Sequence, residues 1–189
     1  MLRTNTDLLT FIEHLYTLQE RKEDIILRSF NKGERLLEQD VKIGKVFIIK
    51  EGVTKCYLTE ENDKEYLFEF LGKGQIIGEI EALKSRACLC TVEAISAVSA
   101  YCLSASFFLS LVDKNLEINK ILLQELTDRI LHTSSRASFQ QLYSLEHGLS
   151  KLLQLQEKEQ IDLSRDDMAA YLGITIRSLN RALKQLKKT

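Results

Sequence analysis

The chain has 189 residues, of which 44% are hydrophobic, enough to bury a core in one or two domains. Its formal net charge of -1 conceals a basic C-terminus. Between positions 175 and 189 there is no acidic residue, and the basic ones are Arg177, Arg181, Lys184, Lys187 and Lys188. That end is the candidate for binding a polyanion.

The N-terminal segment predicts a short amphipathic helix over residues 8–18, because apolar residues recur there at helical spacing. Asp7 and Glu13 fall within this pattern, and no cleavage site of small residues follows. The segment therefore does not resemble a secretory signal. We expect a cytoplasmic protein whose cysteines remain thiols rather than form structural disulfides.

Short β-rich runs extend from about residue 30 to residue 103, separated by glycines or charged turn residues, as in "KVFIIKEG" and "EYLFEFLG". Six or more strands at this spacing predict a small antiparallel roll. The uncharged run over 95–112 is long enough to suggest a membrane span. Serines interrupt it, and apolar residues alternate at Val98, Ala100 and Cys102, which favours a strand leading into a helix. We expect no membrane contact.

Residues 106–143 contain no glycine, proline or turn cluster, which predicts one long helix. Within it, apolar residues recur every seven positions, and a second row of residues with the same spacing, the companion row, runs beside them. This is the pattern of a coiled-coil seam, although its second half is polar. A helix of ~45 Å is long for a domain of this size, so we prefer a dimer helix to a buried intrachain one. The expected dimer contacts are Leu116, Leu123, Leu126, Ile130, Thr133 and Ala137.

The last segment predicts three helices, and the final two have a helix-turn-helix pattern. Ser164 and Asp167 have the spacing of a helix cap, and Gly173 permits the tight turn. Ala169 is small enough for a second helix to cross closely. Apolar residues after the turn supply the contacts between the two helices.

The second helix of the pair, from about Thr175, carries side chains that suit DNA. Arginine can bind guanine bidentately, asparagine can bind adenine, and lysine or serine can bind phosphate. The alternative is a solvated cationic helix end that complements the helix dipole. Because the basic residues occur together with the helix-turn-helix spacing of apolar residues, DNA binding is favoured over this alternative. The expected DNA contacts are Arg165, Thr175, Ile176, Arg177, Ser178, Asn180, Arg181 and Lys184.

The order of a strand-rich sensor, a long helix and a helix-turn-helix resembles the Crp/Fnr family of transcription regulators, of the cyclic AMP receptor protein type. "FLGKGQIIGEI" is similar to the family's roll signature, and "MAAYLGITIRSLNRALKQL" to its reading head. The resemblance implies an α+β fold with a cyclic-nucleotide-binding-type antiparallel β-roll (jelly roll), a long dimerisation helix and a C-terminal helix-turn-helix of the winged-helix type. The expected domains are a helix and sensor roll over 1–112, a dimerisation helix over 113–143 and a DNA-binding domain over 144–189.

By the same resemblance we expect a homodimer on double-stranded DNA, in contact with RNA polymerase. The family's base-reading positions fall on Ile176, Arg177 and Arg181. Arg181 matches a family arginine, whereas Ile176 and Arg177 replace an arginine and a glutamate, so the DNA sequence recognised should differ. The sequence ends at Thr189, where the family usually continues into a β-wing. We expect either a shortened chain or a reduced wing.

The sensor half matches the family's nucleotide site only in part. Gly78 and Glu79 match the pair at the ribose. Aligning "TVEA", residues 91–94, places a cysteine and a leucine where the family has its phosphate-binding arginine and serine. Arg86 lies two residues earlier and reaches inward only if its loop is remodelled. The expected effector-pocket residues are Ile77, Gly78, Glu79, Ile80, Arg86, Cys88, Leu89, Thr133 and Ser134.

Thr133 and Ser134 resemble the pair that contacts the adenine in the family. The alternative is therefore a regulator that responds to a cyclic nucleotide and binds its phosphate through Arg86. Loss of the charged phosphate contact costs ~1.5–3 kcal/mol, so we expect an effector other than cyclic AMP and name no certain cofactor. No cysteine precedes Cys56, which argues against an iron-sulfur cluster, and the histidines are scattered, which supports haem only weakly.

Cys88 and Cys90 are two residues apart, so we expect them to face the same side of a strand and to be buried as small apolar groups. The alternative is a thiol sensor near Arg86. The spacing lacks the second pair of a zinc site, and we expect no metal. No catalytic motif is present, so we expect no enzyme. The remaining alternative is a ligand-binding or interaction module with reduced or no DNA binding.

Overall fold

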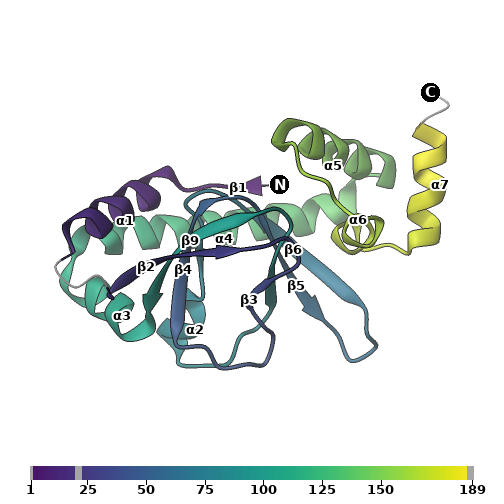
Figure 1. Ribbon diagram of the computed structural model, residues 1–189. Coiled ribbons are helices and arrows are strands. Elements are labelled where there is room, and N and C mark those ends of the chain that lie inside the picture. The colour runs from purple at the N-terminus through teal and green to yellow at the C-terminus, as the bar shows by residue number, and fades with distance from the viewer. Residues whose placement is uncertain (1, 20–22, 187–189) are drawn as a thin grey trace.

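The computed structural model describes residues 2–19 and 23–186, and it consists of a β-roll, helices packed on it and three C-terminal helices at one end (Figure 1). The strands are β1 (Leu2–Arg3), β2 (Ile25–Phe30), β3 (Arg35–Leu37), β4 (Lys45–Glu51), β5 (Thr54–Thr59), β6 (Glu65–Leu71), β7 (Ile76–Ile77), β8 (Thr91–Ala94) and β9 (Val98–Ser104). The helices are α1 (Thr6–Leu18), α2 (Glu79–Lys84), α3 (Ala105–Lys114), α4 (Leu116–Leu142), α5 (Leu145–Glu159), α6 (Arg165–Leu172) and α7 (Ile176–Leu186).

The roll contains two sheets, with strand orders β1-β6-β5-β8-β3 and β2-β9-β4-β7. The pairing is antiparallel except between β1 and β6, which confirms the predicted antiparallel roll. The sequence of β4 is a continuous apolar run rather than an alternating one because both faces of this strand are buried. Phe47 and Ile49 pack between the two sheets, whereas Val46 and Ile48 pack against helices on the other face.

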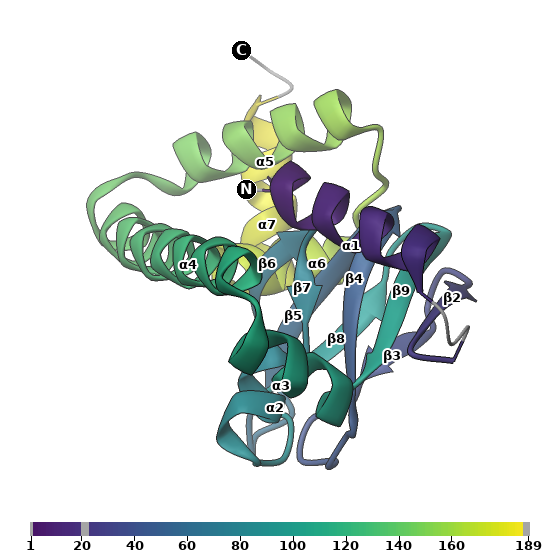
Figure 2. The ribbon, with the colours of Figure 1, turned by 90° about the vertical axis from the view of Figure 1, so that its left-hand side faces the viewer.

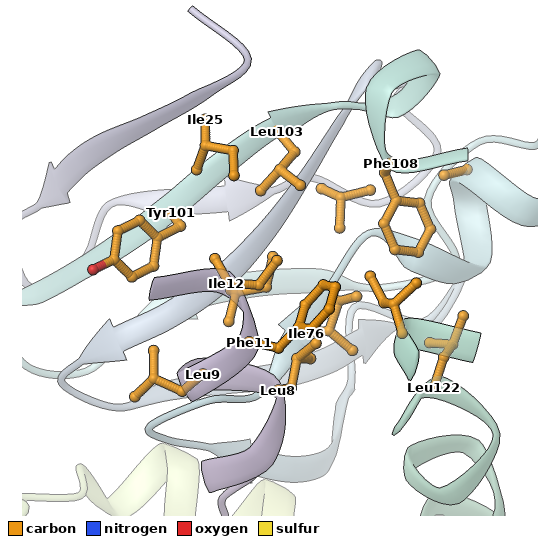
Figure 3. Close-up of a cluster of buried hydrophobic side chains, with 14 residues drawn as sticks. Leu8, Leu9, Phe11, Ile12, Ile25, Ile76, Tyr101, Leu103, Phe108 and Leu122 are labelled. Atoms are coloured by element: carbon orange, nitrogen blue, oxygen red, sulfur yellow. The ribbon is translucent and has the colours of Figure 1, made fainter. Parts of the chain in front are cut away.

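Those helices are α1, α3 and the beginning of α4, which cover the outer face of the second sheet. Figure 3 shows Leu8 and Ile12 of α1, Phe108 of α3 and Leu122 of α4 meeting the strands in one apolar cluster. Figure 2 shows the same helices from the side. The helix predicted for residues 8–18 is confirmed, since α1 spans Thr6–Leu18.

The expected single helix over 106–143 is wrong, because α3 and α4 are separated at Asn115. This residue has an extended backbone, with φ -122° and ψ 112°. Its backbone N–H donates to Leu111 O at the end of α3, and its side-chain oxygen accepts from the N–H groups of Glu117 and Ile118 at the start of α4. Asparagine therefore ends one helix and caps the next without any glycine or proline.

The three predicted C-terminal helices are confirmed as α5, α6 and α7. Ser164 and Asp167 form a reciprocal capping box at the start of α6. Gly173 ends that helix with φ 68°, in the left-handed region that glycine adopts without strain. Lys187, Lys188 and Thr189, part of the predicted basic end, lie outside the described residues.

The N-terminal segment is held to the roll at Gly74, which has φ 80° and donates its N–H to Ile49 O at 2.7 Å. A Cβ at this position would lie 1.7 Å from the carbonyl oxygen of Asn5. Asn5 in turn caps α1 by accepting a hydrogen bond from Leu8 N–H at 2.9 Å. Glycine is therefore required here both for its backbone angle and for the close approach of the chain that begins α1.

Replacing Gly74 by alanine should lower the free energy of unfolding by roughly 3 kcal/mol or more, because strain and a backbone clash act together. Gly33→Ala is the matched control: Gly33 has φ 89°, and nothing lies within 4 Å of its added Cβ. The control should cost only the left-handed strain, about 1–2 kcal/mol. Chemical denaturation of both variants measures the difference, and equal losses would contradict the role given to the clash.

Candidate nucleic-acid interface and sensor site

Helix α7 presents a basic face to solvent. Leu179 and Ala182 are buried against the neighbouring C-terminal helices, so the opposite face points outward. That outward face forms one shallow depression, lined by Ile176, Arg177, Asn180, Arg181 and Lys184. The structure therefore brings five of the residues expected to contact DNA onto a single surface, which we call the reading face.

Three other expected contacts support the reading face from its edge. Thr175 caps α7, because its side-chain oxygen accepts from Ser178 N–H at 3.2 Å. The hydroxyl of Thr175 also donates to that of Ser178 at 3.1 Å. Arg165, at the start of α6, donates to the side-chain oxygen of Asn180. The first turn of α7 and the Asn180 amide are thus held in place before any ligand binds.

Helix α7, which carries the reading face, lies at the opposite end of the molecule from α1 (Figure 1). Its neighbour α6 docks on the roll. Lys55 of β5 lies 2.6 Å from the Asp167 carboxylate and 3.3 Å from that of Glu93. Burial alone would lower the pKa of Lys55, but the hydrogen bond and charge of Asp167, with Glu93, raise it. The capping carboxylate of α6 is therefore also the one that binds the roll.

Arg136 and Tyr171 make the second part of this docking contact. Tyr171 stacks on Phe70 of β6, with ring centroids 5.3 Å apart. Arg136 of α4 lies over the Tyr171 ring at 4.2 Å and donates to the carbonyl oxygens of Phe68 and Tyr171. One guanidinium thus ties the long helix, the roll and α6 together.

The sensor site is built around Glu79 at the start of α2. Gly78 precedes it with φ 89°, and a Cβ there would lie 2.8 Å from Lys45 O. Glu79 is 1% exposed, and Arg129 of α4 donates to its carboxylate and, at 3.3 Å, to Ile76 O. Burial raises the pKa of Glu79, although the charge of Arg129 acts in the opposite direction. Ile77 is buried beside them and Ile80 is half-buried.

Arg129 belongs to a larger buried cluster that the sequence reasoning missed. Its Nε lies 3.8 Å from Glu69, and its Nη2 lies 3.9 Å from Glu125. Arg3 of β1 contacts the same two carboxylates. Burial would lower the pKa of Arg129, but the carboxylates raise it, so it remains charged. Three carboxylates thus face two guanidinium groups, and neither cation of this cluster is left unpaired.

Four of the other expected pocket residues lie at the surface. Arg86, Thr133 and Ser134 are exposed, and Leu89 is 47% exposed. Thr133 donates its hydroxyl to Arg129 O within α4. This spacing of one helical turn was the signal that could have identified Arg129, since residues four apart share a helix face.

The expectation that Cys88 and Cys90 face one side of a strand is wrong, because β8 begins only at Thr91. The Cys88 backbone instead bonds to the preceding loop, donating to Val41 O at 3.0 Å and accepting from Asp40 N–H at 2.8 Å. Both side chains nevertheless pack in the core between the sheets.

Among the described residues, no group of three or more metal-binding side chains comes together. In the same part of the chain, no helix is both long and apolar enough to cross a bilayer.

Two family models match the sequence. The cyclic nucleotide-binding domain matches residues 27–115, and the Crp-like helix-turn-helix domain matches residues 141–189. No curated protein sequence matches the chain.

Solved structures with the same fold cover most of both chains. The c-di-GMP-responsive global regulator CLP of Xanthomonas campestris is 17% identical, with a TM-score of 0.79 over 95% of this chain and 91% of that one. FixK2 of Bradyrhizobium japonicum is 20% identical, with a TM-score of 0.70 over 87% and 85%. A CRP/FNR-family transcriptional regulator of Thermus thermophilus is 18% identical, with a TM-score of 0.73 over 86% of each chain.

Replacing Arg129 by glutamine should lower the free energy of unfolding by roughly 3–5 kcal/mol at neutral pH, because buried carboxylates lose their partner. Without Arg129, the folded-state pKa of Glu79 rises further above its value in the unfolded chain. The stability contribution of Glu79 is then present at low pH and lost as the pH rises through that folded-state pKa. The deficit relative to the unmodified protein should therefore shrink as the pH falls from neutral.

Denaturation at several pH values measures this deficit. Arg35→Gln is the control, since it breaks an exposed ion pair with Glu38 and should cost less than about 1 kcal/mol at every pH. A deficit for the Arg129 variant that does not change with pH would contradict the assignment of Arg129 as the partner of Glu79.

Proposed function

The chain belongs to the Crp/Fnr family of transcriptional regulators, and from that premise we propose a homodimeric, sequence-specific DNA-binding regulator whose effector is not cyclic AMP. The observation that carries the proposal is the basic, outward-facing reading face of α7. Such a regulator acts in the cytoplasm, and contact with RNA polymerase belongs to the same proposal. The proposed division into 1–112, 113–143 and 144–189 is supported by the helix break at Asn115 and by Ser144, which caps α5.

The reading face combines side chains that suit both bases and phosphates. Arg177 and Arg181 are exposed and can bind guanine edges or phosphates, while Lys184 can bind phosphate. Ile176 is 44% exposed among these polar groups, and an apolar side chain there suits the methyl group of thymine. Because the first residues of a recognition helix enter the major groove, Ile176 and Arg177 are placed to read bases.

The apolar row of α4 supports the homodimer. Ile118 and Leu122 pack against the roll, whereas Leu116, Leu123 and Ile130 are 70%, 65% and 67% exposed. Leu126 of the companion row is half-buried against the roll, and Thr133 and Ala137 are exposed. A solvated helix stripe of this kind is stabilised when a second copy covers it. In a dimer, α4 would place two reading faces on one side of a duplex, ~34 Å apart.

The charges of the sensor site support an effector other than cyclic AMP. A cyclic phosphate needs a cation, but Arg129 already faces Glu69, Glu79 and Glu125. Arg86 is exposed and would have to turn inward with its loop. An added anion would join a cluster that already holds more carboxylates than guanidinium groups, which disfavours binding.

Arg181→Ala should reduce discrimination between specific and random DNA by about 1–3 kcal/mol, because one base-contacting guanidinium is lost. The specific duplex is the pseudo-palindrome selected by the unmodified protein from a randomised pool. Fluorescence anisotropy at fixed salt gives both affinities. Lys42→Ala, which removes an exposed lysine of the roll, is the control and should leave the ratio unchanged. An unchanged ratio for Arg181→Ala would refute the assignment.

Leu123→Glu and Ile130→Glu should each convert the dimer to a monomer, because a carboxylate cannot be buried without a partner in the helix seam. Sedimentation velocity reports the mass directly. Lys114→Glu changes the charge at an exposed position of α3 and should leave the dimer intact. Dimers that persist in both α4 variants would exclude this stripe as the interface.

A further inference from the structure

Two thiols from distant parts of the sequence meet inside the roll. The sulfur atoms of Cys56 and Cys90 lie 2.8 Å apart and share a hydrogen bond. Cys56 lies on β5, and Cys90 immediately precedes Thr91, where the neighbouring strand β8 begins. They pack in the core between the two sheets, where little room exists for them to separate.

The two thiols differ in their accessibility to solvent. Cys56 is buried, whereas Cys90 is partly exposed. The hydrogen bond with Cys90, followed by burial, raises the pKa of Cys56. Cys90 is the sulfur that a soluble oxidant reaches first.

We propose that Cys56 and Cys90 form a redox-active pair that a hydroperoxide oxidises to an intrachain disulfide and a dithiol reduces again. The Cys90 sulfur attacks the peroxide, the O–O bond breaks, and the products are a sulfenic acid at Cys90 and an alcohol or water. The Cys56 sulfur then attacks the Cys90 sulfur. The S–S bond forms, the S–O bond breaks, and the hydroxyl group leaves as water with the Cys56 proton. The two sulfurs together lose the two electrons that the peroxide gains.

The other two cysteines lack these properties. Cys88 is 2% exposed, and burial, with the charge of Glu81, raises its pKa to about 11. Cys102 is 4% exposed and lies on β9 between β2 and β4, with its pKa raised by burial. Neither combines access to solvent with a neighbouring thiol as Cys90 does. They serve as internal controls.

The thiol pair adjoins both the charge cluster of the sensor site and the contact that docks α6 on the roll. Cys56 is paired across the sheet with Glu69, whose carboxylate binds Arg3 and Arg129. The residue before it, Lys55, holds Asp167 of α6. A bond between Cys56 and Cys90 would thus fix β5 where the charge cluster and the docking contact meet. Any effect on DNA binding rests on the proposed function, but formation of the disulfide does not.

The test treats the full-length reduced protein with hydrogen peroxide and follows it by intact-mass and peptide mass spectrometry. The expected product is lighter by two hydrogens, contains a Cys56–Cys90 linked peptide and returns to the starting mass with dithiothreitol. N-Ethylmaleimide given to the reduced fold should label Cys90 before the other three cysteines. Because the readout is mass, failure of this proposal is separate from failure of DNA binding.

Three variants sharpen the result. Cys56→Ala should stop at a Cys90 sulfenic acid that dimedone traps, and Cys90→Ala should give neither disulfide nor adduct. Cys102→Ala, the matched control in the same core, should form the disulfide as the unmodified protein does. Cys90 is partly exposed, so its variant tests the proposal even if the Cys56 variant fails to fold. Free thiols that persist in peroxide, or a disulfide joining any other pair, would overturn the proposal.

Discussion

The ion pair between Arg129 and Glu79 is the interaction on which the arrangement of the sensor depends. Arg129 comes from the long helix α4 and Glu79 from the first turn of α2, so the pair fixes α4 against the part of the roll where α2 begins. Arg3 joins the same cluster through Glu125 and Glu69, which brings in β1 and β6. Buried ion pairs contribute little net stability, but a broken one is costly, so this cluster sets the position of α4 more than it adds to stability.

The position of α4 has consequences at both of its faces. One face packs on the roll, where Ile118 and Leu122 are buried, and this leaves Leu123 and Ile130 exposed on the face proposed to meet a second copy. Further along the same helix, Arg136 reaches Tyr171 of α6. A change at the sensor site that moves α4 would therefore act on the proposed dimer interface and on the docked helix α6 together.

Docking of the reading head depends on a carboxylate with two tasks. Asp167 closes the capping box with Ser164 and also binds Lys55 of the roll. Loss of the Lys55 contact would weaken the docking of α6 on the roll while leaving its cap, and Tyr171 would still stack on Phe70. Lys55 directly precedes Cys56, which places the thiol pair at the strand that holds the head.

Local patterns in the sequence determined the elements and the reading face, because caps, turn glycines and helical spacing act over a few residues. Ser164 with Asp167, Gly173 and the polar face of α7 were all predicted in this way. The break at Asn115 was missed because asparagine can cap a helix as well as extend one. Only the tertiary structure decided the partners of Arg129, Lys55 and Cys56, since each meets residues far away in the sequence. Such contacts depend on how the sheets and helices pack, and no local spacing records that packing.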